Sequence, residues 1–394
     1  MSHTVILSAA RTPVGKLGGG LSSLEATELG GIAIKAALER AEVEPEQVEH
    51  VVMGTVIQAG QGQIPSRQAQ IEAGIPREVS SETINKVCAS GIRAVGMIDQ
   101  AVRAGDLDLA VAGGMESMSN APWLLPKARF GFRMGDVKAL DAMIQDALRN
   151  PFTGKQMYEE ATEVGDELEM TRADLDKWAL RSHERWAEAF DSGRLPEEIV
   201  PVTVSSKKGD TTVQEDEAPR RDTSLEKLAR LPGLAGKDGS HTAGNSPGVN
   251  DGAGALVLAS EEWASKNGRE VLATIVAQGA VADDFPYLAR TPAKAALKAL
   301  GKLGLSPDDV DLWEINEAFA SVALNSTRML DIDEGKVNVN GGAVAIGHPV
   351  GASGARILGT LVHELRRRGG GLGVAAICSG GGQGDAVIVE VNGR

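Results

Sequence analysis

The 394-residue sequence is poor in aromatic side chains and has only two cysteines. Phenylalanine, tryptophan and tyrosine make up 3 % of the chain, so the core must consist of small aliphatic side chains in close helix-to-sheet contact, as in a layered α/β protein. Two cysteines in so long a chain exclude a disulfide framework and indicate a reducing compartment. No run approaches the ~18 apolar residues of a membrane span, and no signal-like segment opens the chain, so we expect a cytoplasmic protein.

Positive charge is also scarce. The 40 lysines and arginines are outnumbered by 54 aspartates and glutamates, which gives a formal net charge of −14. A surface of this sign repels nucleic acid and anionic membranes, so neither is an expected partner. No cluster of cysteine, histidine and aspartate has metal-ligand spacing, so we expect no metal. The glycines at 380–382 lack the Lys-Ser or Lys-Thr that would follow in a phosphate loop, which argues against a nucleotide site of that kind.

The first and last thirds of the chain alternate β-branched runs with helical patterns, which is typical of βαβ units around a mostly parallel sheet. Each third also has an extended segment, a reactive residue and then a helix of small residues, with Cys88 in the first third and His348 in the last. The repetition predicts an internal duplication in which the two helix N-termini face each other across a pseudo-twofold axis. The expected strands are 4–7, 51–54, 107–112, 251–259, 271–280, 310–315, 337–340 and 372–377, and the expected helices are 30–41 and 352–368.

The middle of the chain, from about residue 119 to 249, breaks this alternation. It contains an amphipathic helix near 171–191, with Thr171 and Asp174 placed as an N-terminal cap pair. We interpret this region as an inserted loop domain that covers the site. The predicted domains are residues 1–118 with 250–272 as the N-terminal core half, 119–249 as the insertion, and 273–394 as the C-terminal core half.

Both cysteines lie in glycine-containing segments. Cys88 precedes Ser90 and Gly91, which open a predicted helix, so the helix dipole and nearby backbone N–H groups would lower the pKa of its thiol. The alternative for such a lone cysteine is an inert packing role. Cys378 stands before glycines 380–382, where it is either a small residue that fits the turn or a second thiol that moves a proton.

His348 is fixed between Gly347 and Pro349, and the small residues of 351–354 leave space for a ligand. A clamped imidazole suits a proton acceptor, and a turn histidine satisfied by backbone groups is the alternative. Together with an asparagine segment at 316–320, these residues outline an acyl-transfer site.

Four motifs in this order resemble the thiolase family, and the resemblance covers essentially the whole chain. Each cysteine, the histidine and the asparagine stands in one of them. The motifs are Asn85-Lys86-Val87-Cys88-Ala89-Ser90-Gly91, Asn316-Glu317-Ala318-Phe319-Ala320, Gly341-Gly342-Ala343-Val344-Ala345-Ile346-Gly347-His348-Pro349 and Cys378-Ser379-Gly380-Gly381-Gly382. The resemblance implies an α/β fold with a duplicated βαβαβαββ core in five α-β-α-β-α layers and an inserted loop domain.

The resemblance also implies a reaction. Cys88, deprotonated by His348, would take an acyl group from one acyl-CoA, and Cys378 would abstract the α-proton of a second. One oxyanion hole would use His348 and a water held by Asn316, and the other the backbone N–H groups of Cys88 and Gly380. Coenzyme A would be substrate and product, and no cofactor would be needed.

By similarity, coenzyme A would contact the insertion and the segments beside it. The positions implied are Leu148, Met157, Arg220, Ser246, Pro247 and Phe319. Residues 121–136 look like the loop that joins two dimers, so a homodimer is implied and a homotetramer favoured. Gln156, Tyr158 and Pro247 depart from the residues common in short-chain members; the tyrosine changes the volume beside the acyl pocket, and the proline lacks a hydroxyl and an N–H donor.

The leading hypothesis is a thiolase of fatty acid metabolism that reversibly condenses two acetyl-CoA molecules to acetoacetyl-CoA and CoA through an acyl-cysteine intermediate. One alternative is a degradative member that cleaves longer 3-ketoacyl-CoA chains. Another is a protein of this fold that binds acyl-CoA or lipid without turnover. Cys378 argues against a decarboxylating ketoacyl synthase, which lacks the second catalytic cysteine. Chain length and branching, physiological direction and pathway do not follow from the motifs.

Overall fold

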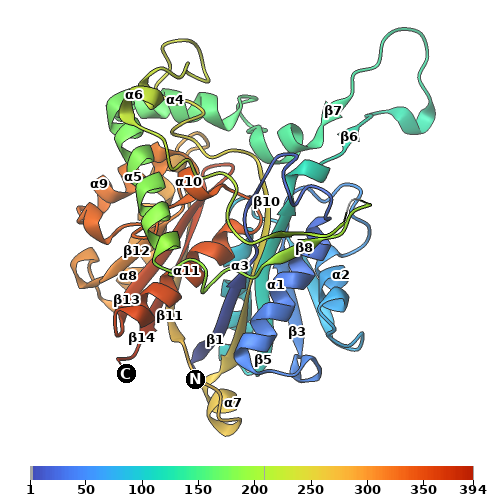
Figure 1. The fold of residues 1–394 in the computed structure, drawn as a ribbon, viewed down its shortest axis with the longest axis vertical. Helices are drawn as coiled ribbons and strands as arrows, with labels where there is room; N and C mark the ends of the chain where they lie inside the picture. Colours follow the sequence, from blue (N-terminus) through green and yellow to red (C-terminus); the bar gives the residue numbers. More distant parts are fainter. Residues whose placement is uncertain (1–2, 208, 394) are drawn as a thin grey trace.

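The computed structural model describes residues 3–207 and 209–393, in which one large mixed sheet carries helices on both faces (Figure 1). Its strands are β1 (Thr4–Arg11), β2 (Gly15–Lys16), β3 (His50–Gly54), β4 (Ser80–Ile84), β5 (Leu109–Ser117), β10 (Asn250–Ser260), β11 (Ala273–Ala282), β12 (Leu312–Ile315), β13 (Gly371–Ser379) and β14 (Gln383–Val391). The order across the sheet is β12-β13-β14-β11-β1-β10-β5-β3-β4, and the short β2 pairs with β10.

The sheet has two halves with the same plan, which meet where β1 and β11 pair antiparallel. Outward from β1 the order is β10, β5, β3 and β4, and outward from β11 it is β14, β13 and β12. The parallel pair β3–β5 corresponds to β12–β13, and the antiparallel pair β5–β10 corresponds to β13–β14. The predicted internal duplication is therefore confirmed by the topology. The expectation of a mostly parallel sheet is wrong, because six of its nine strand pairings are antiparallel and the parallel ones are confined to the outer strands of each half.

The counterpart of β4 in the C-terminal half is reduced to a single bridge. Val337 pairs in parallel with Trp313, and the next residue, Asn338, turns away with φ 49°. The Asn338 side chain then takes the place of a strand, since its Oδ1 accepts from Ile315 N–H at 2.8 Å and its Nδ2 donates to Ile315 O at 2.8 Å. The predicted strand at 337–340 is therefore wrong.

Helices pack on the sheet in the predicted α-β-α-β-α order. They are α1 (Ala26–Ala41), α2 (Pro65–Glu72), α3 (Ser90–Ala104), α7 (Glu261–Lys266), α8 (Thr291–Leu303), α9 (Ala320–Leu330), α10 (Ala343–Ile346) and α11 (Ser353–Arg367). α1 covers the outer face of the N-terminal half with α2 beside it, and α8 covers the outer face of the C-terminal half with α9 beside it. α3 and α11 lie against each other between the two halves (Figure 1).

The two central helices approach each other closely at their first turns. A Cβ atom on Gly91 would lie 2.8 Å from Ala355 N, and one on Gly354 would lie 2.3 Å from Ile92 N. Only glycine permits so close an approach of two backbones. The turns that precede these helices, one from each half, are thereby brought together.

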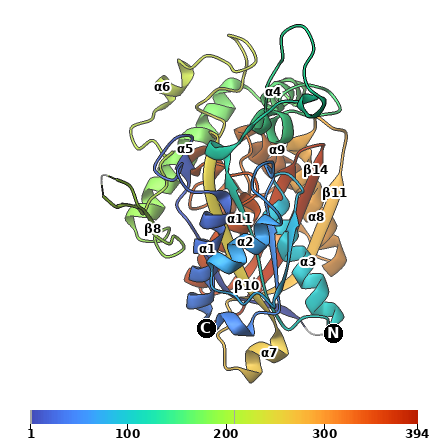
Figure 2. The same ribbon diagram turned by 90° about the vertical axis from the view of Figure 1, so that its right-hand side faces the viewer.

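Most of the insertion between β5 and β10 lies at the end of the molecule away from both termini, and its β8 segment lies at mid-height near α1 (Figure 2). Its elements are β6 (Trp123–Leu124), β7 (Leu140–Asp141), a π-helix (Met143–Leu148), α4 (Met157–Glu167), α5 (Arg172–Asp191), β8 (Val202–Val204), β9 (Thr211–Val213) and α6 (Leu225–Ala229). α5 starts as predicted, because Thr171 Oγ1 accepts from Asp174 N–H at 3.2 Å. Among the described residues, no helix has the length and apolar character needed to cross a membrane.

Candidate active site

Cys88 lies in the tight turn that joins β4 to α3. The turn is closed locally, since Ser90 Oγ accepts from Lys86 N–H at 2.8 Å and donates to Val87 O at 2.7 Å. Val87 has φ 44°, which is strained for a β-branched residue and is typical of functional turns. The thiol of Cys88 points inward and only 4 % of the residue is exposed.

Burial raises the pKa of the Cys88 thiol to about 12. Hydrogen bonds from the backbone N–H groups of Cys88 and Gly380 act in the opposite direction, and the Glu116 carboxylate adds to the rise. The lowered pKa expected from the sequence is therefore wrong for the resting chain, because removal of the thiolate from water outweighs two backbone donors. The structure does bring to the sulfur the two N–H groups that were predicted to form an oxyanion hole.

Cys378 lies near the end of β13, in the other half of the fold. Burial raises the pKa of its thiol well above the ordinary value, and a thiolate at Cys88 would raise it further. Gly380, two residues further on, is closely packed, since a Cβ atom there would lie 2.8 Å from Met157 Cε and 3.2 Å from Val87 Cγ1 and would displace these side chains. Because both pKa values are raised, both thiols rest protonated. After Cys378 the chain turns so that the backbone N–H of Gly380 faces the Cys88 sulfur.

His348 is held so that one ring nitrogen stays free to accept a proton. Its Nδ1 lies 2.6 Å from Ser353 Oγ, and that hydroxyl donates its own proton to Pro349 O at 3.0 Å. Nδ1 must then carry the hydrogen, which leaves Nε2 unprotonated. Burial, with a smaller effect of Arg356, lowers the pKa of His348 to about 3, so the imidazole rests neutral.

Asn316 follows β12 and faces His348. Its Nδ2 lies 3.5 Å from His348 Nε2, and Arg356 Nη2 lies 3.5 Å from its Oδ1. Because Arg356 has only donors, it fixes the amide with the oxygen toward the guanidinium and the NH₂ group toward the imidazole. Asn316 is fully buried.

Lys86 links the segments of the two cysteines across the halves of the fold. Its backbone oxygen accepts a hydrogen bond from Ser379 Oγ, and its ammonium pairs with Asp385 on β14. The side chains of Lys86 and Asp385 are 19 % and 7 % exposed. The position of Cys88 relative to Gly380 is thereby fixed by the contacts of Lys86 with Ser379 and Asp385.

The three reactive side chains meet in one cavity of about 210 Å³. Most of its lining is apolar and comes from both halves and from the insertion. The residues predicted from the sequence that line it are Cys88, Leu148, Met157, Ser246, Pro247, Phe319, His348 and Cys378, and Gln156 and Tyr158 line it as well. Asn316 adjoins the cavity through its contact with His348, and Gly380 through its N–H toward Cys88.

The structure does not bring Arg220 to this cavity. Arg220 is exposed after β9, and its backbone N–H donates to His183 Nδ1 at 3.1 Å. Of the residues predicted to contact coenzyme A, it alone stands apart from the thiol-lined cavity.

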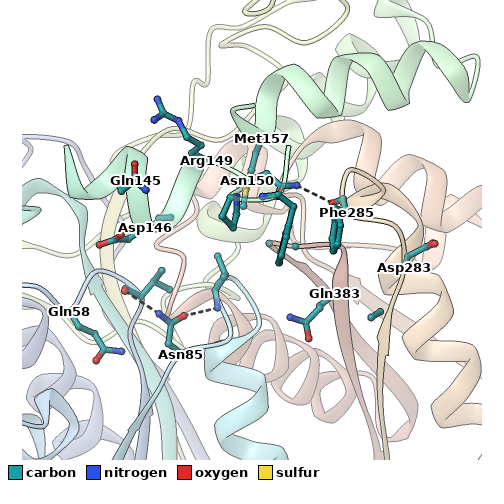
Figure 3. Close-up of a pocket in the computed structure, with 18 of the residues that line it drawn as sticks. Gln58, Asn85, Gln145, Asp146, Arg149, Asn150, Met157, Asp283, Phe285 and Gln383 are labelled. Carbon is teal, nitrogen blue, oxygen red and sulfur yellow. Dashed lines mark hydrogen bonds between the residues drawn. The ribbon is translucent and has the colours of Figure 1, made fainter. Parts of the chain in front are cut away.

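A second, larger pocket of about 870 Å³ lies behind the oxyanion donors (Figure 3). Val87, Met157 and Gly380 form its wall toward the thiols, and Phe152 and Phe285 stack at 4.1 Å on another side. Neither cysteine lines it. Met157 alone belongs to both pockets.

Sequence reasoning missed several residues that hold the site together. Ser353 sets the tautomer of His348, and Asn250 Oδ1 accepts from His348 N–H at 2.9 Å. The sequence did carry a signal for Ser353, because it is a serine in the first turn of the helix that follows the clamped His348. Asn250 had no local signal, because it lies on β10, far from His348 in the chain.

Two thiols, a neutral imidazole with a free Nε2 and a pair of backbone N–H donors around an apolar cavity define an acyltransferase that works through a cysteine. The comparisons agree with this class. The sequence model of the thiolase N-terminal domain matches residues 4–262, and that of the thiolase C-terminal domain matches residues 269–391. The chain belongs to the thiolase family.

Similar proteins and structures extend over the whole chain. A probable acetyl-CoA acetyltransferase of Mycolicibacterium smegmatis is 48 % identical over 98 % of this chain and 100 % of its own length. An acetyl-CoA acetyltransferase of Cupriavidus necator is 47 % identical over 99 % of this chain and 100 % of its own. The crystal structure of the Bacillus anthracis acetyl-CoA acetyltransferase superposes with a TM-score of 0.97 at 40 % identity and covers 99 % of both chains.

Proposed function

We propose that this thiolase is an acetyl-CoA C-acetyltransferase, which condenses two acetyl-CoA molecules to acetoacetyl-CoA and CoA and catalyses the reverse cleavage. The observation that carries the proposal is the single cavity that Cys88, His348 and Cys378 line together. The full-length similarity to proteins named acetyl-CoA acetyltransferases supports the acetyl group as substrate. The reaction uses no metal or cofactor, and coenzyme A enters and leaves as substrate and product.

In the first step the Cys88 thiol gives its proton to His348 Nε2, and the sulfur attacks the thioester carbon of acetyl-CoA. The N–H groups of Cys88 and Gly380, which already face that sulfur, hold the oxygen that becomes negative. The thiolate of CoA leaves and takes the proton of Cys378. The products are acetyl-Cys88, free CoA, a protonated His348 and a Cys378 thiolate.

In the second step the Cys378 thiolate removes an α-proton from a second acetyl-CoA. The protonated His348 and a water held by Asn316 stabilise the enolate oxygen. The enolate carbon attacks acetyl-Cys88, and the Cys88 thiolate leaves and recovers its proton from His348. Each side chain is then back in its starting state.

Leu148, Met157, Ser246, Pro247 and Phe319 would contact the pantetheine and the acyl group. Arg220 keeps its predicted contact with the nucleotide of coenzyme A only if the nucleotide extends along the surface beyond the cavity. Mutation of Arg220 to Ala with measurement of the KM for CoA tests this arrangement. The division into residues 1–118 with 250–272, 119–249 and 273–394 stays a prediction.

We also propose that the enzyme is a homotetramer built from two dimers. It would be located in the cytoplasm and act in fatty acid metabolism. Exposed apolar side chains on the hairpin between β6 and β7 support the assembly, since Phe130 is 93 % and Met134 is 101 % exposed and the hairpin projects from the body of the chain (Figure 1). Light scattering after size-exclusion chromatography should give four chains for the parent and two for a Phe130→Ser/Met134→Ser variant. A monomeric parent would contradict the assembly.

Cleavage of acetoacetyl-CoA with added CoA tests the activity, followed through the loss of the enolate absorbance beside a longer 3-ketoacyl-CoA. Fast turnover of the four-carbon substrate is expected. Preference for the longer chain would make the enzyme a degradative thiolase. Binding of CoA without turnover of either substrate would leave only a binding role.

A further inference from the structure

Glu116 is a fully buried carboxylate near the C-terminal end of strand β5, and the reaction steps do not use it. Its Oε1 accepts from Thr55 Oγ1 and from Ile57 N–H, both at 3.1 Å. Its Oε2 accepts from Val56 N–H and from Gly351 N–H, both at 3.0 Å. One carboxylate therefore receives three backbone N–H groups and a hydroxyl.

These donors belong to the two sides of the active site. Residues 55–57 follow β3 in the N-terminal half, and Val56 O accepts from Asn85 Nδ2 at 3.3 Å in the Cys88 motif. Gly351 belongs to the C-terminal half and comes three residues after His348. Glu116 thus connects the segment behind the nucleophile to the turn that carries the base.

The backbone around Gly351 is too closely packed to admit a side chain. A Cβ atom on Gly114 would lie 1.9 Å from Gly351 O, and one on Gly351 would lie 2.8 Å from Glu116 Oε2 and 3.0 Å from Thr55 Cα. The end of β5, the end of β3 and the histidine turn are in direct backbone contact there. A shift of the Gly351 N–H is transmitted to His348 because Pro349 stiffens the link between them.

The partners of Glu116 are unusual for a buried glutamate. Among the described residues that hydrogen-bond to it, none is a lysine or arginine, whereas buried carboxylates are mostly paired with a cation. Burial raises the pKa of Glu116 to about 7, and the four donors act against that rise. A group of this kind is costly to keep, which argues for a role in holding the site.

We propose that Glu116 is a positioning residue: by accepting from Gly351 N–H on one side and from residues 55–57 on the other, it sets the distance between His348 and Cys88. The inference rests on the proposed function, because that distance matters for proton transfer from Cys88 to His348. Such a transfer needs donor and acceptor within about 2.6–3.2 Å. A misplacement of about 1 Å lowers a rate about 100-fold.

Glu116→Gln tests the proposal with a side chain of the same shape. The amide NH₂ meets Ile57 N–H if it takes the place of Oε1, and it meets Val56 and Gly351 N–H if it takes the place of Oε2. In either orientation two donors face each other, which displaces the side chain and weakens the connection. We expect the kcat of acetoacetyl-CoA cleavage to fall about 100-fold, with the KM for CoA within about threefold of the parent value. Glu116→Asp keeps the charge but is one methylene shorter, and its kcat should fall less than that of Glu116→Gln.

Asp99→Asn is the matched control. Asp99 is a buried carboxylate later in α3, which accepts from Arg103 Nε at 2.7 Å and from Gln278 Nε2 at 2.8 Å and has no contact with the histidine turn. This variant should keep its kcat. Equal losses in Glu116→Gln and Asp99→Asn would show a general effect of buried carboxylates and overturn the proposal, as would an unchanged kcat in Glu116→Gln.

Amide hydrogen exchange of the peptide covering 347–353 gives a readout without activity. Glu116→Gln should exchange faster there than the parent, and Asp99→Asn should not. Unchanged exchange overturns the positioning role. If the parent itself shows no thiolysis, the proposed function fails, while the exchange result still decides whether Glu116 holds the turn.

Discussion

The two halves of the sheet share one plan but hold their reactive residues in different ways. The Cys88 turn is short and closed by its own backbone and by Ser90. The histidine turn is long, and side chains from elsewhere hold its backbone N–H groups. Glu317 accepts from Val344 N–H at 3.0 Å, Asn250 from His348 N–H at 2.9 Å and Glu116 from Gly351 N–H at 3.0 Å.

The comparison shows how a duplicated scaffold acquires two roles. The strands and central helices repeat, while the connections before α3 and α11 differ in length and in the way they are fixed. A nucleophile needs a defined backbone around it, because its own N–H also binds the oxyanion. A base needs a defined ring orientation, which side-chain hydrogen bonds supply.

The largest expected effect separates the two thiols. Cys88→Ala should lose about 10⁴-fold or more in acyl exchange and form no acyl-enzyme, because the nucleophile is gone. Cys378→Ala should still accumulate acetyl-Cys88 from acetyl-CoA but fail to form acetoacetyl-CoA. Mass spectrometry of the intact chain after acetyl-CoA addition distinguishes them. An acyl-enzyme in the Cys88→Ala protein would contradict the assignment of the nucleophile to the N-terminal half.

The next effect concerns the ion pair that crosses between the halves. Asp385→Asn leaves the Lys86 ammonium without its carboxylate in a mostly buried place, so we expect a loss of about 3 kcal/mol in the free energy of unfolding. The Lys86→Met/Asp385→Asn double variant should lose less than the sum of the single variants. Urea unfolding of all four proteins gives the coupling, and simple additivity would show that the pair does not connect the halves.

A smaller effect compares the equivalent glycines of the central helices. Gly354→Ala should destabilise by about 2 kcal/mol and Gly91→Ala by less, because the new methyl group meets backbone at 2.3 Å in the first case and 2.8 Å in the second. Gly301→Ala in α8, where a Cβ atom meets nothing within 4 Å, is the control and should stabilise by about 0.5 kcal/mol. The urea midpoints of the three variants measure these changes in stability. Equal losses in Gly91→Ala and Gly354→Ala would contradict the expected difference between the two contacts.

The smallest effect extends the comparison to the insertion. Burial lowers the pKa of His241 to about 4 from 6.5, so its contribution to stability is present above pH 6.5 and is lost as the pH falls toward 4. The free energy of unfolding of His241→Gln should therefore fall less steeply than that of the parent between pH 6.5 and 4. Equal slopes would mean that the insertion does not bury this ring.

Sequence patterns were sufficient wherever local chemistry decides the structure. The repeated strands, the Thr171 cap of α5 and the order of the reactive motifs all follow from nearby residues. The failures depend on contacts distant in the chain. Asn338 replaces a strand because Ile315 lies beside it, and burial by other segments reverses the expected pKa of Cys88.

The site itself was predicted residue by residue as far as the motifs extend. Five of the six positions expected around coenzyme A line the thiol cavity, and Arg220 does not. Glu116 and Asn250 escaped notice because an acidic or amide residue on a strand has no local signal for a partner far away in the sequence. Only the folded chain shows which backbone groups they hold.

The close contact of α3 with α11 at Gly91 and Gly354 also bears on how the chain matures. During synthesis Cys88 leaves the ribosome well before His348, so for that interval the cell contains a thiol without a base beside it. An unfinished or half-folded chain therefore cannot consume acyl thioesters by this route. Recovery of activity after refolding should accordingly trail the return of helical structure, since the enzyme works only once α3 and α11 have packed against each other.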